Sequence, residues 1–163
     1  MPTLDVTPIK QEDERWCWVT VASMVSVYYA QSGGGTAKRP CEIASLALAQ
    51  DCCNYVPPDP PPDECRTAGY VENALAVINH LADTTQPSNA FDVVVTEIGG
   101  RRPLCSSFQF FAGPLHYLLV VGFDSARGEV SFIDPADGHL YQSLYPSFIQ
   151  NSRGHWVGWT FTR

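Results

Sequence analysis

The pattern of hydrophobic and polar positions divides the chain into a helical first half and a strand-rich second half. Residues 1–15 are polar with two prolines, which predicts an extended arm. Residues 16–29 are uncharged and apolar almost all round. Four β-branched valines there favour a strand locally, but the length of the segment and its small residues favour a buried central helix. We therefore predict a helix, which the glycine run at 33–35 ends.

Shorter elements follow the central helix. Amphipathic helices are predicted over residues 40–53 and 69–82, with a stiff proline-rich surface loop at 57–63 between them and a polar loop at 83–90. The later segments have the alternation or the short apolar runs of strands. The predicted strands are 91–98, 104–111, 116–123, 129–133, 140–144 and 156–161, with turns at 124–128 and 134–138. Helices followed by an antiparallel meander indicate an α+β fold.

Length and charge narrow the classes of function. The 163 residues fit one domain, 1–163, and 45% hydrophobic with 17% charged residues is a globular composition. A net charge of −7 argues against a nucleic-acid partner, because phosphate binding needs clustered Lys and Arg. The longest apolar run, residues 117–123, is far short of the roughly 20 residues that cross a bilayer. We expect no nucleic-acid partner and no membrane span.

Cys17 is the candidate nucleophile. It lies between two tryptophans at the first turn of the predicted central helix, where unpaired N–H groups and the helix dipole stabilise a thiolate. A lone buried cysteine is more often inert packing, so a base is needed to support the functional reading. His116 begins the most apolar strand, after the Gly113-Pro114 break, and is the candidate base.

The other histidines are weaker candidates for the base. His80 is expected on the polar face of its helix and His139 in a turn, whereas His155, before Trp156, is the serious competitor.

Two more residues complete the constellation. A hairpin centred near residue 126 places about residue 136 opposite His116, because antiparallel partners sum to a constant. Asp134 and Asp137 are therefore both near enough to orient the imidazole, and we favour Asp134, which ends the returning strand. Gln11, six residues before Cys17, carries a side-chain amide that can stabilise an oxyanion together with the backbone N–H of Cys17.

Gln11, Cys17 followed by Trp18, His116 and Asp134 together resemble the site of the papain-like cysteine peptidases. The sequence is similar to a compact bacterial branch, the AvrRpt2-type effector peptidases and the C39-like peptidases, over roughly residues 8–140. The segments that carry this similarity are 11–24, 41–45, 51–53, 113–124 and 132–138.

The resemblance implies a role for each of these four residues. Cys17 would be the nucleophile, His116 the general base and acid, Asp134 its orienting group and Gln11 a donor in the oxyanion hole. It also implies a helical N-terminal half, with its buried central helix packed on a C-terminal antiparallel sheet, and no cofactor or metal. The sequence departs from classical members in Arg15-Trp16 before the nucleophile and in Asp where they have Asn.

The other five cysteines carry a separate signal. Cys41, Cys52, Cys53 and Cys65 form a cluster, but its only close pair is adjacent, which is poor geometry for a metal ion. We expect two disulfides, Cys41 with Cys52 or Cys53 and the remaining one with Cys65. Cys105 is then a free core residue.

The leading interpretation is a monomeric cysteine endopeptidase acting on a protein or peptide substrate, with a cognate inhibitor or immunity protein as a further partner. The same triad also suits deamidation, transglutamination or acyl transfer, because water and an amine attack the same thioester. The third interpretation is a catalytically inactive binding module of the same fold. The first 15 residues show no secretory signal, whereas the cysteine cluster suits an exported protein. We expect secretion or delivery by a dedicated system, as a bacterial effector or toxin, and a cytoplasmic location otherwise.

Overall fold

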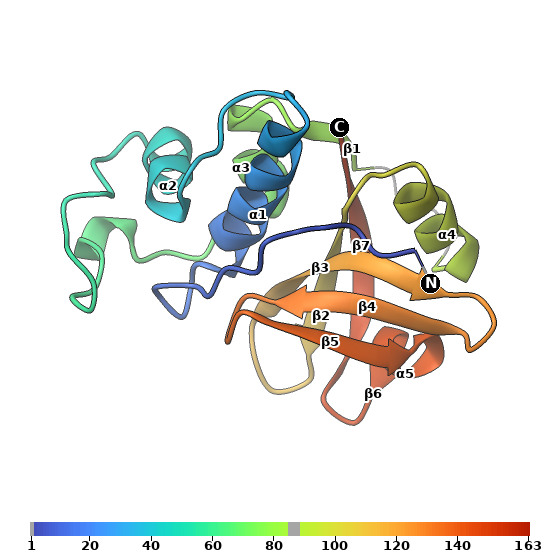
Figure 1. Ribbon diagram of the computed structural model, residues 1–163. Helices are drawn as coiled ribbons and strands as arrows, with labels where there is room; N and C mark the ends of the chain where they lie inside the picture. Colours follow the sequence, from blue (N-terminus) through green and yellow to red (C-terminus); the bar gives the residue numbers. More distant parts are fainter. Residues whose placement is uncertain (1, 85–88) are drawn as a thin grey trace.

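The first half of the chain is helical, as predicted. The computed structural model describes residues 2–84 and 89–163. The helices of the first half are α1 (Cys17–Gln31), α2 (Pro40–Leu48), a short 3-10 helix (Asp63–Cys65) and α3 (Val71–Val77). Helix α1 packs against α2, α3 and the sheet, so it is the buried central helix that its composition predicts (Figure 1).

The second half forms an antiparallel sheet. Within the described residues its strands are β1 (Leu81–Asp83), β2 (Leu104–Phe110), β3 (Leu115–Asp124), β4 (Glu129–Asp134), β5 (His139–Leu144), β6 (Gln150–Asn151) and β7 (Gly154–Thr162). The strand order is β1-β7-β2-β3-β4-β5, and β6 pairs with β7. Every pair is antiparallel, which confirms the predicted α+β class.

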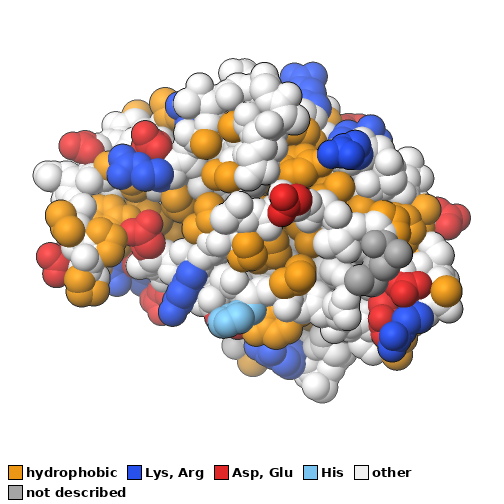
Figure 2. All heavy atoms as spheres, in the orientation of Figure 1, with side chains coloured by type: hydrophobic (Ala, Val, Ile, Leu, Met, Phe, Trp, Pro, Cys, Tyr) orange, Lys and Arg blue, Asp and Glu red, His pale blue; other side chains and the backbone are white. Residues whose placement is uncertain are grey.

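Two hydrophobic clusters cover the two faces of this sheet. Because successive side chains of a strand point to opposite faces, β3 contributes Tyr117 and Leu119 to the cluster around α1. It contributes Leu118 and Val120 to the other cluster. Helices α4 (Phe91–Gly99) and α5 (Tyr145–Ile149) pack on this second side. The edge strand β5 is mostly exposed, and Figure 2 shows hydrophobic side chains at the surface over β4 and β5.

The predicted strand over residues 91–98 is wrong, because this segment forms helix α4. Its consecutive valines favour a strand locally. The apolar positions Phe91, Val94 and Ile98 nevertheless recur at the spacing of a helix face, and Val94 and Ile98 are fully buried against the sheet. Burial of this face outweighs the local β propensity.

Two predicted helices are shorter than expected. Helix α2 ends at Leu48, where Ala49 takes the left-handed conformation with φ of 54°. Helix α3 ends at Val77, and the chain then continues into β1. The polar loop predicted at 83–90 includes residues 85–88, which lie outside the described residues.

The structure also corrects the predicted positions of two histidines. His80 is not on a polar helix face, because it follows α3, is buried, and stacks on Tyr29 with ring centroids 4.9 Å apart. Its Nδ1 is hydrogen-bonded to the carbonyl of Arg163 at 2.8 Å. His139 begins strand β5 instead of lying within the turn before it.

The N-terminal arm crosses the sheet and ends beside the β4–β5 turn (dark blue in Figure 1). Near its start, the Leu4 N–H donates to the Val121 carbonyl of β3 at 2.8 Å. At its far end, the Gln11 N–H donates to the Pro135 carbonyl at 2.7 Å. The arm is therefore hydrogen-bonded to the sheet near its start and to the β4–β5 turn at Gln11. The second bond fixes the backbone position of Gln11. No helix in the described part of the chain has the length and apolarity to cross a membrane.

Candidate active site

Cys17 is the first residue of α1 and is 7% exposed. The tryptophans on both sides of it are buried, and their indole N–H groups donate to one segment of the chain. Trp16 Nε1 donates to the Cys65 carbonyl at 2.8 Å, and Trp18 Nε1 donates to the Thr67 carbonyl at 3.2 Å. The start of the helix is thus fixed on both sides of the thiol.

His116 lies near the start of β3, and its side chain is 13% exposed. Its Nε2 lies 2.7 Å from Asp134 Oδ1, and the Cys17 thiol is near enough to the ring to raise its pKa. Since Nε2 is occupied by Asp134, Nδ1 is the ring nitrogen left for the thiol. The structure therefore brings Cys17, His116 and Asp134 into one continuous chain of contacts.

The hairpin register explains why Asp134 reaches the histidine. Leu119 pairs with Ile133, so Asp134, the next residue and the last of β4, comes close to the start of β3. The pairing ends before residue 136, and a register shift between Val120 and Gly122 separates it from the register at the turn. Asp137 turns elsewhere, since it accepts hydrogen bonds from the Tyr141 hydroxyl and from the His139 N–H. Of the two candidate carboxylates, the structure thus brings Asp134 to the imidazole.

The electrostatics of His116 favour its protonated form. Burial lowers its pKa, but hydrogen bonds to Asp134 and Cys17, with the negative charge of both partners, raise the pKa to about 9. At neutral pH the site can therefore hold an imidazolium beside the sulfur. This is the charge arrangement that stabilises a thiolate and places a proton donor next to it.

Gln11 lies in the same cleft but is bonded to the arm. Its Nε2 donates to the Asp13 carbonyl at 2.9 Å, and its buried Oε1 has no partner within the described residues. A side-chain amide carries two N–H donors, so one is left after the bond to Asp13. Gln11, His116 and Asp134 line one hollow of about 470 Å³, which we call the arm hollow.

A second hollow has a volume of about 400 Å³. Cys17, Trp18, Gly69, Tyr70 and Tyr117 line it, and we call it the Cys17 hollow. An ideal Cβ on Gly69 would lie 2.6 Å from the Trp18 ring, so only a glycine lets the loop pack this closely on Trp18. Cys17 thus lines one hollow and His116 the other, so both reacting side chains border open space.

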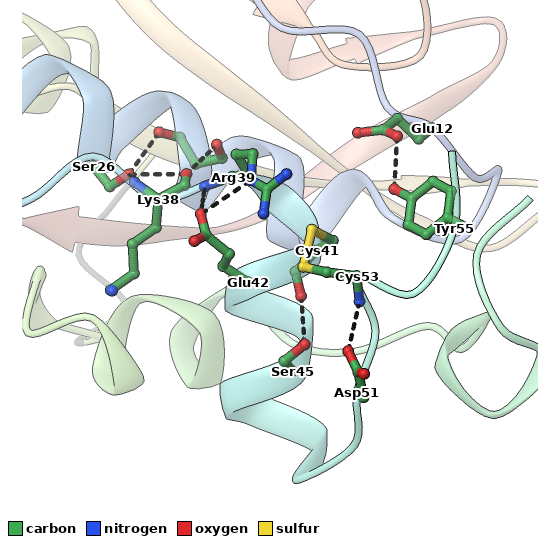
Figure 3. A network of polar contacts seen from close by, with 11 residues as sticks. Glu12, Ser26, Lys38, Arg39, Cys41, Glu42, Ser45, Asp51, Cys53 and Tyr55 are labelled. Atoms are coloured by element: carbon green, nitrogen blue, oxygen red, sulfur yellow. Dashed lines mark hydrogen bonds and ion pairs between the residues drawn. A yellow bond between two sulfur atoms is a disulfide. The ribbon is translucent and has the colours of Figure 1, made fainter. Parts of the chain in front are cut away.

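The two disulfides join Cys41 to Cys53 and Cys52 to Cys65. This is one of the two pairings that the sequence left open, and Cys105 is free and buried as expected. Figure 3 shows the first disulfide linking α2 to the loop that follows it.

Sequence reasoning missed the support that the disulfide-linked segment gives to the site. The buried Asp13 pairs with Arg66 at 2.7 Å and also accepts the Arg15 N–H at 2.9 Å. In the same region, the Tyr55 hydroxyl donates to Glu12 at 2.6 Å (Figure 3). Contacts between residues about fifty positions apart leave no local sequence signal. The four clustered cysteines were a partial signal, because they indicated that this segment is cross-linked.

His155, the competing histidine, lies on β7 opposite Gln109 of β2. Its ring lies 5.7 Å from that of Phe111. It lines neither the Cys17 hollow nor the arm hollow. Among the described histidines, His116 is therefore the one that lies beside Cys17.

Comparison with known proteins gives a family and a similar fold. A family model described as the Peptidase_C39 like family matches residues 3–160. The fold is similar to that of xylellain, a cysteine protease from Xylella fastidiosa, with a TM-score of 0.53 and 11% sequence identity over 100% of this chain and 86% of that chain. No curated protein sequence gives a significant match. The structural likeness confirms the predicted papain-like fold.

Proposed function

Because this chain belongs to the Peptidase_C39 like family, we propose that it is a cysteine endopeptidase whose nucleophile is Cys17. The observation that carries this proposal is the continuous contact from the Cys17 thiol through the His116 ring to Asp134. A nucleophile, a base and an orienting carboxylate in this order are what acyl transfer to a thiol requires.

Before the substrate binds, the thiol proton resides on His116, so the reacting pair is a Cys17 thiolate beside an imidazolium. The thiolate attacks the carbonyl carbon of the scissile bond, and the oxyanion accepts hydrogen bonds from the Cys17 backbone N–H and the second amide N–H of Gln11. The imidazolium then gives its proton to the leaving amine as the carbon–nitrogen bond breaks. Asp134 keeps the ring oriented and stabilises its charged form throughout.

Water completes the cycle. His116 takes a proton from a water molecule, which attacks the thioester, and the carbon–sulfur bond breaks to release the new carboxyl group and the thiol. An amine in place of water would give acyl transfer, and a side-chain amide in place of the peptide bond would give deamidation. These alternatives share every residue with hydrolysis and differ in acceptor or substrate.

We further propose that the chain acts as one monomeric domain outside the cell that makes it, as a secreted effector or toxin restrained by a cognate inhibitor. The two disulfides support this setting, because disulfides persist in oxidising compartments and are rare in a reducing cytosol. An AvrRpt2-type specificity within the papain-like group belongs to the same proposal.

Thiol alkylation tests the ion pair without a known substrate. With iodoacetamide at about pH 6, where ordinary thiols react slowly, mass mapping should find Cys17 labelled faster than the thiol of free N-acetylcysteine in the same mixture. His116→Ala should remove this excess rate, whereas the buried Cys105 stays unlabelled in both proteins. Labelling of Cys17 no faster than the free thiol, or unchanged in His116→Ala, would contradict the proposed nucleophile.

Digestion of a peptide library then identifies the reaction. We expect new amino termini with the wild type and none with Cys17→Ala. Gln11→Ala should slow the reaction about a hundredfold or more, since it removes one oxyanion donor. Products that carry an added amine, or deamidated glutamine without chain cleavage, would replace the peptidase proposal with one of its alternatives.

A further inference from the structure

A third hollow, of about 130 Å³, adjoins the reacting histidine and is not used by the chemistry described above. His116 and Asp134 form one end of it, so we call it the His116 hollow. Its walls are apolar and come from β2, β3, β4 and α5. The wall side chains are Phe108, Phe110, Leu118, Phe132 and Phe148.

The rim of the His116 hollow is polar and open. Ser147 and Arg153 on the rim are exposed, and Ser143 of β5 is half-buried. The Arg153 guanidinium lies 5.4 Å from the centre of the Phe110 ring. Phe110 in turn stacks on His116, with ring centroids 5.9 Å apart. One wall of the hollow is thus fixed to the imidazole.

The proton transfers decide which end of a substrate faces each hollow. The acyl part of the substrate becomes bonded to Cys17, and the Cys17 hollow contains the sulfur but not His116. The leaving amine receives its proton from His116, so the residue that contributes this nitrogen must lie next to the imidazole. The side chain of that residue begins two bonds from the nitrogen. His116 lines both the arm hollow and the His116 hollow, but the arm hollow is also lined by the polar residues 11–14, so the His116 hollow is the apolar one of the two.

The size and chemistry of the His116 hollow indicate the side chain that it takes. An engineered protein cavity of about 150 Å³ lined by similar apolar side chains binds benzene. A space of about 130 Å³ with phenylalanine walls therefore suits a branched aliphatic or aromatic side chain. A charged side chain there would lose hydration against the five apolar walls, and the two charged lining residues already have partners, since Asp134 contacts His116 and the Arg153 guanidinium lies over the Phe110 ring.

We propose that the His116 hollow is the subsite for the residue directly after the scissile bond, and that it selects a large apolar side chain. This inference rests on the proposed peptidase function and names part of its substrate class. In an extended peptide the next side chain points the opposite way, out of the His116 hollow.

A proteome-derived peptide library tests this subsite. Sequencing of the new amino termini produced by the wild type should show Leu, Ile, Phe or Met at the first position about tenfold more often than Asp or Lys, relative to their abundance. Ser147→Leu and Ser143→Leu each add a branched side chain at the rim. Both variants should shift the first position toward Gly and Ala and leave the preference before the scissile bond unchanged.

The matched control is Ser125→Leu, the same exchange in the exposed β3–β4 turn, which should cleave as the wild type does. A second measurement uses the acyl-enzyme, whose capture by leucinamide should exceed capture by glycinamide, with the difference reduced in Ser147→Leu. Cleavage without a preference at the first position, or a preference that both rim variants preserve, would overturn the subsite alone. No cleavage by the wild type would refute the peptidase proposal, and the subsite with it.

Discussion

Replacement of Asp134 by Asn is the most informative single perturbation of this site. The Asp134 carboxylate lies 2.7 Å from His116 Nε2 and is the partner whose hydrogen bond most strongly opposes the effect of burial. Asparagine keeps the shape and an oxygen for the Ala136 N–H, which now donates to Oδ1 at 2.9 Å. It removes the negative charge, so the imidazolium loses its main source of stabilisation while the turn is preserved.

The magnitude follows from the raised pKa of His116. At about 1.4 kcal/mol for each tenfold change in equilibrium, the rise from 6.5 to about 9 means that the site favours the imidazolium by about 3 kcal/mol. In Asp134→Asn we expect the pKa of His116 to fall, because burial lowers this pKa and then acts against the remaining contact with Cys17 alone. The loss of a correctly oriented acid and base should lower kcat about a hundredfold or more.

The same pKa gives a pH dependence of stability with a definite sign. The folded protein holds the His116 proton more tightly than the unfolded chain does, so this stabilisation is complete below about pH 6.5 and is lost as the pH rises through about 9. In Asp134→Asn that loss of stability should occur over a narrower range of pH. Thermal unfolding at a series of pH values measures it.

NMR titration of the histidine rings measures the pKa directly, with His116→Gln to assign the signal among the four histidines. The matched control is Asp137→Asn, because Asp137 bonds to Tyr141 and His139 and should leave His116 unchanged. A pKa of His116 that does not respond to Asp134→Asn would refute the reasoning. So would a pKa that Asp137→Asn lowers equally.

Two further changes test the support of the nucleophile. Gly69→Ala places a Cβ against the Trp18 ring, so it should lower the free energy of unfolding by about 1–3 kcal/mol through overpacking and slow the alkylation of Cys17. The control is Gly99→Ala, where the space is open, and it should change neither quantity. Replacing Cys52 and Cys65 together by Ser should lower the free energy of unfolding by about 3 kcal/mol, since the bridge closes a loop with a sequence separation of 13. The double replacement should also slow the alkylation of Cys17, because the Cys65 carbonyl accepts the indole N–H of Trp16, which is next to Cys17 in the chain. Denaturant unfolding measures the free energy, and labelling measures the alkylation rate. If neither quantity changes, the disulfide does not support the nucleophile.

The sequence by itself determined much of the layout of the candidate site. A helix that begins at Cys17 follows from the length and apolar character of the segment, and a strand that begins at His116 follows from its apolar run. One short turn separates β3 from β4, so the hairpin register could be counted from the turn and brought Asp134, the last residue of β4, close to the start of β3. Such features depend on neighbours within a few residues, and propensity and periodicity act at that range.

The tertiary structure decided whatever depends on direction or on distant partners. Asp134 and Asp137 are both close to His116 along the chain, and only the orientation of each side chain in the folded hairpin separates them. The segment 91–98 has the local propensity of a strand, yet it forms a helix because its apolar face is buried against the sheet. The pairing of the clustered cysteines depends on where their Cβ atoms point after folding. The Asp13–Arg66 pair and the His116 hollow join segments far apart in the chain, so no local pattern predicts them.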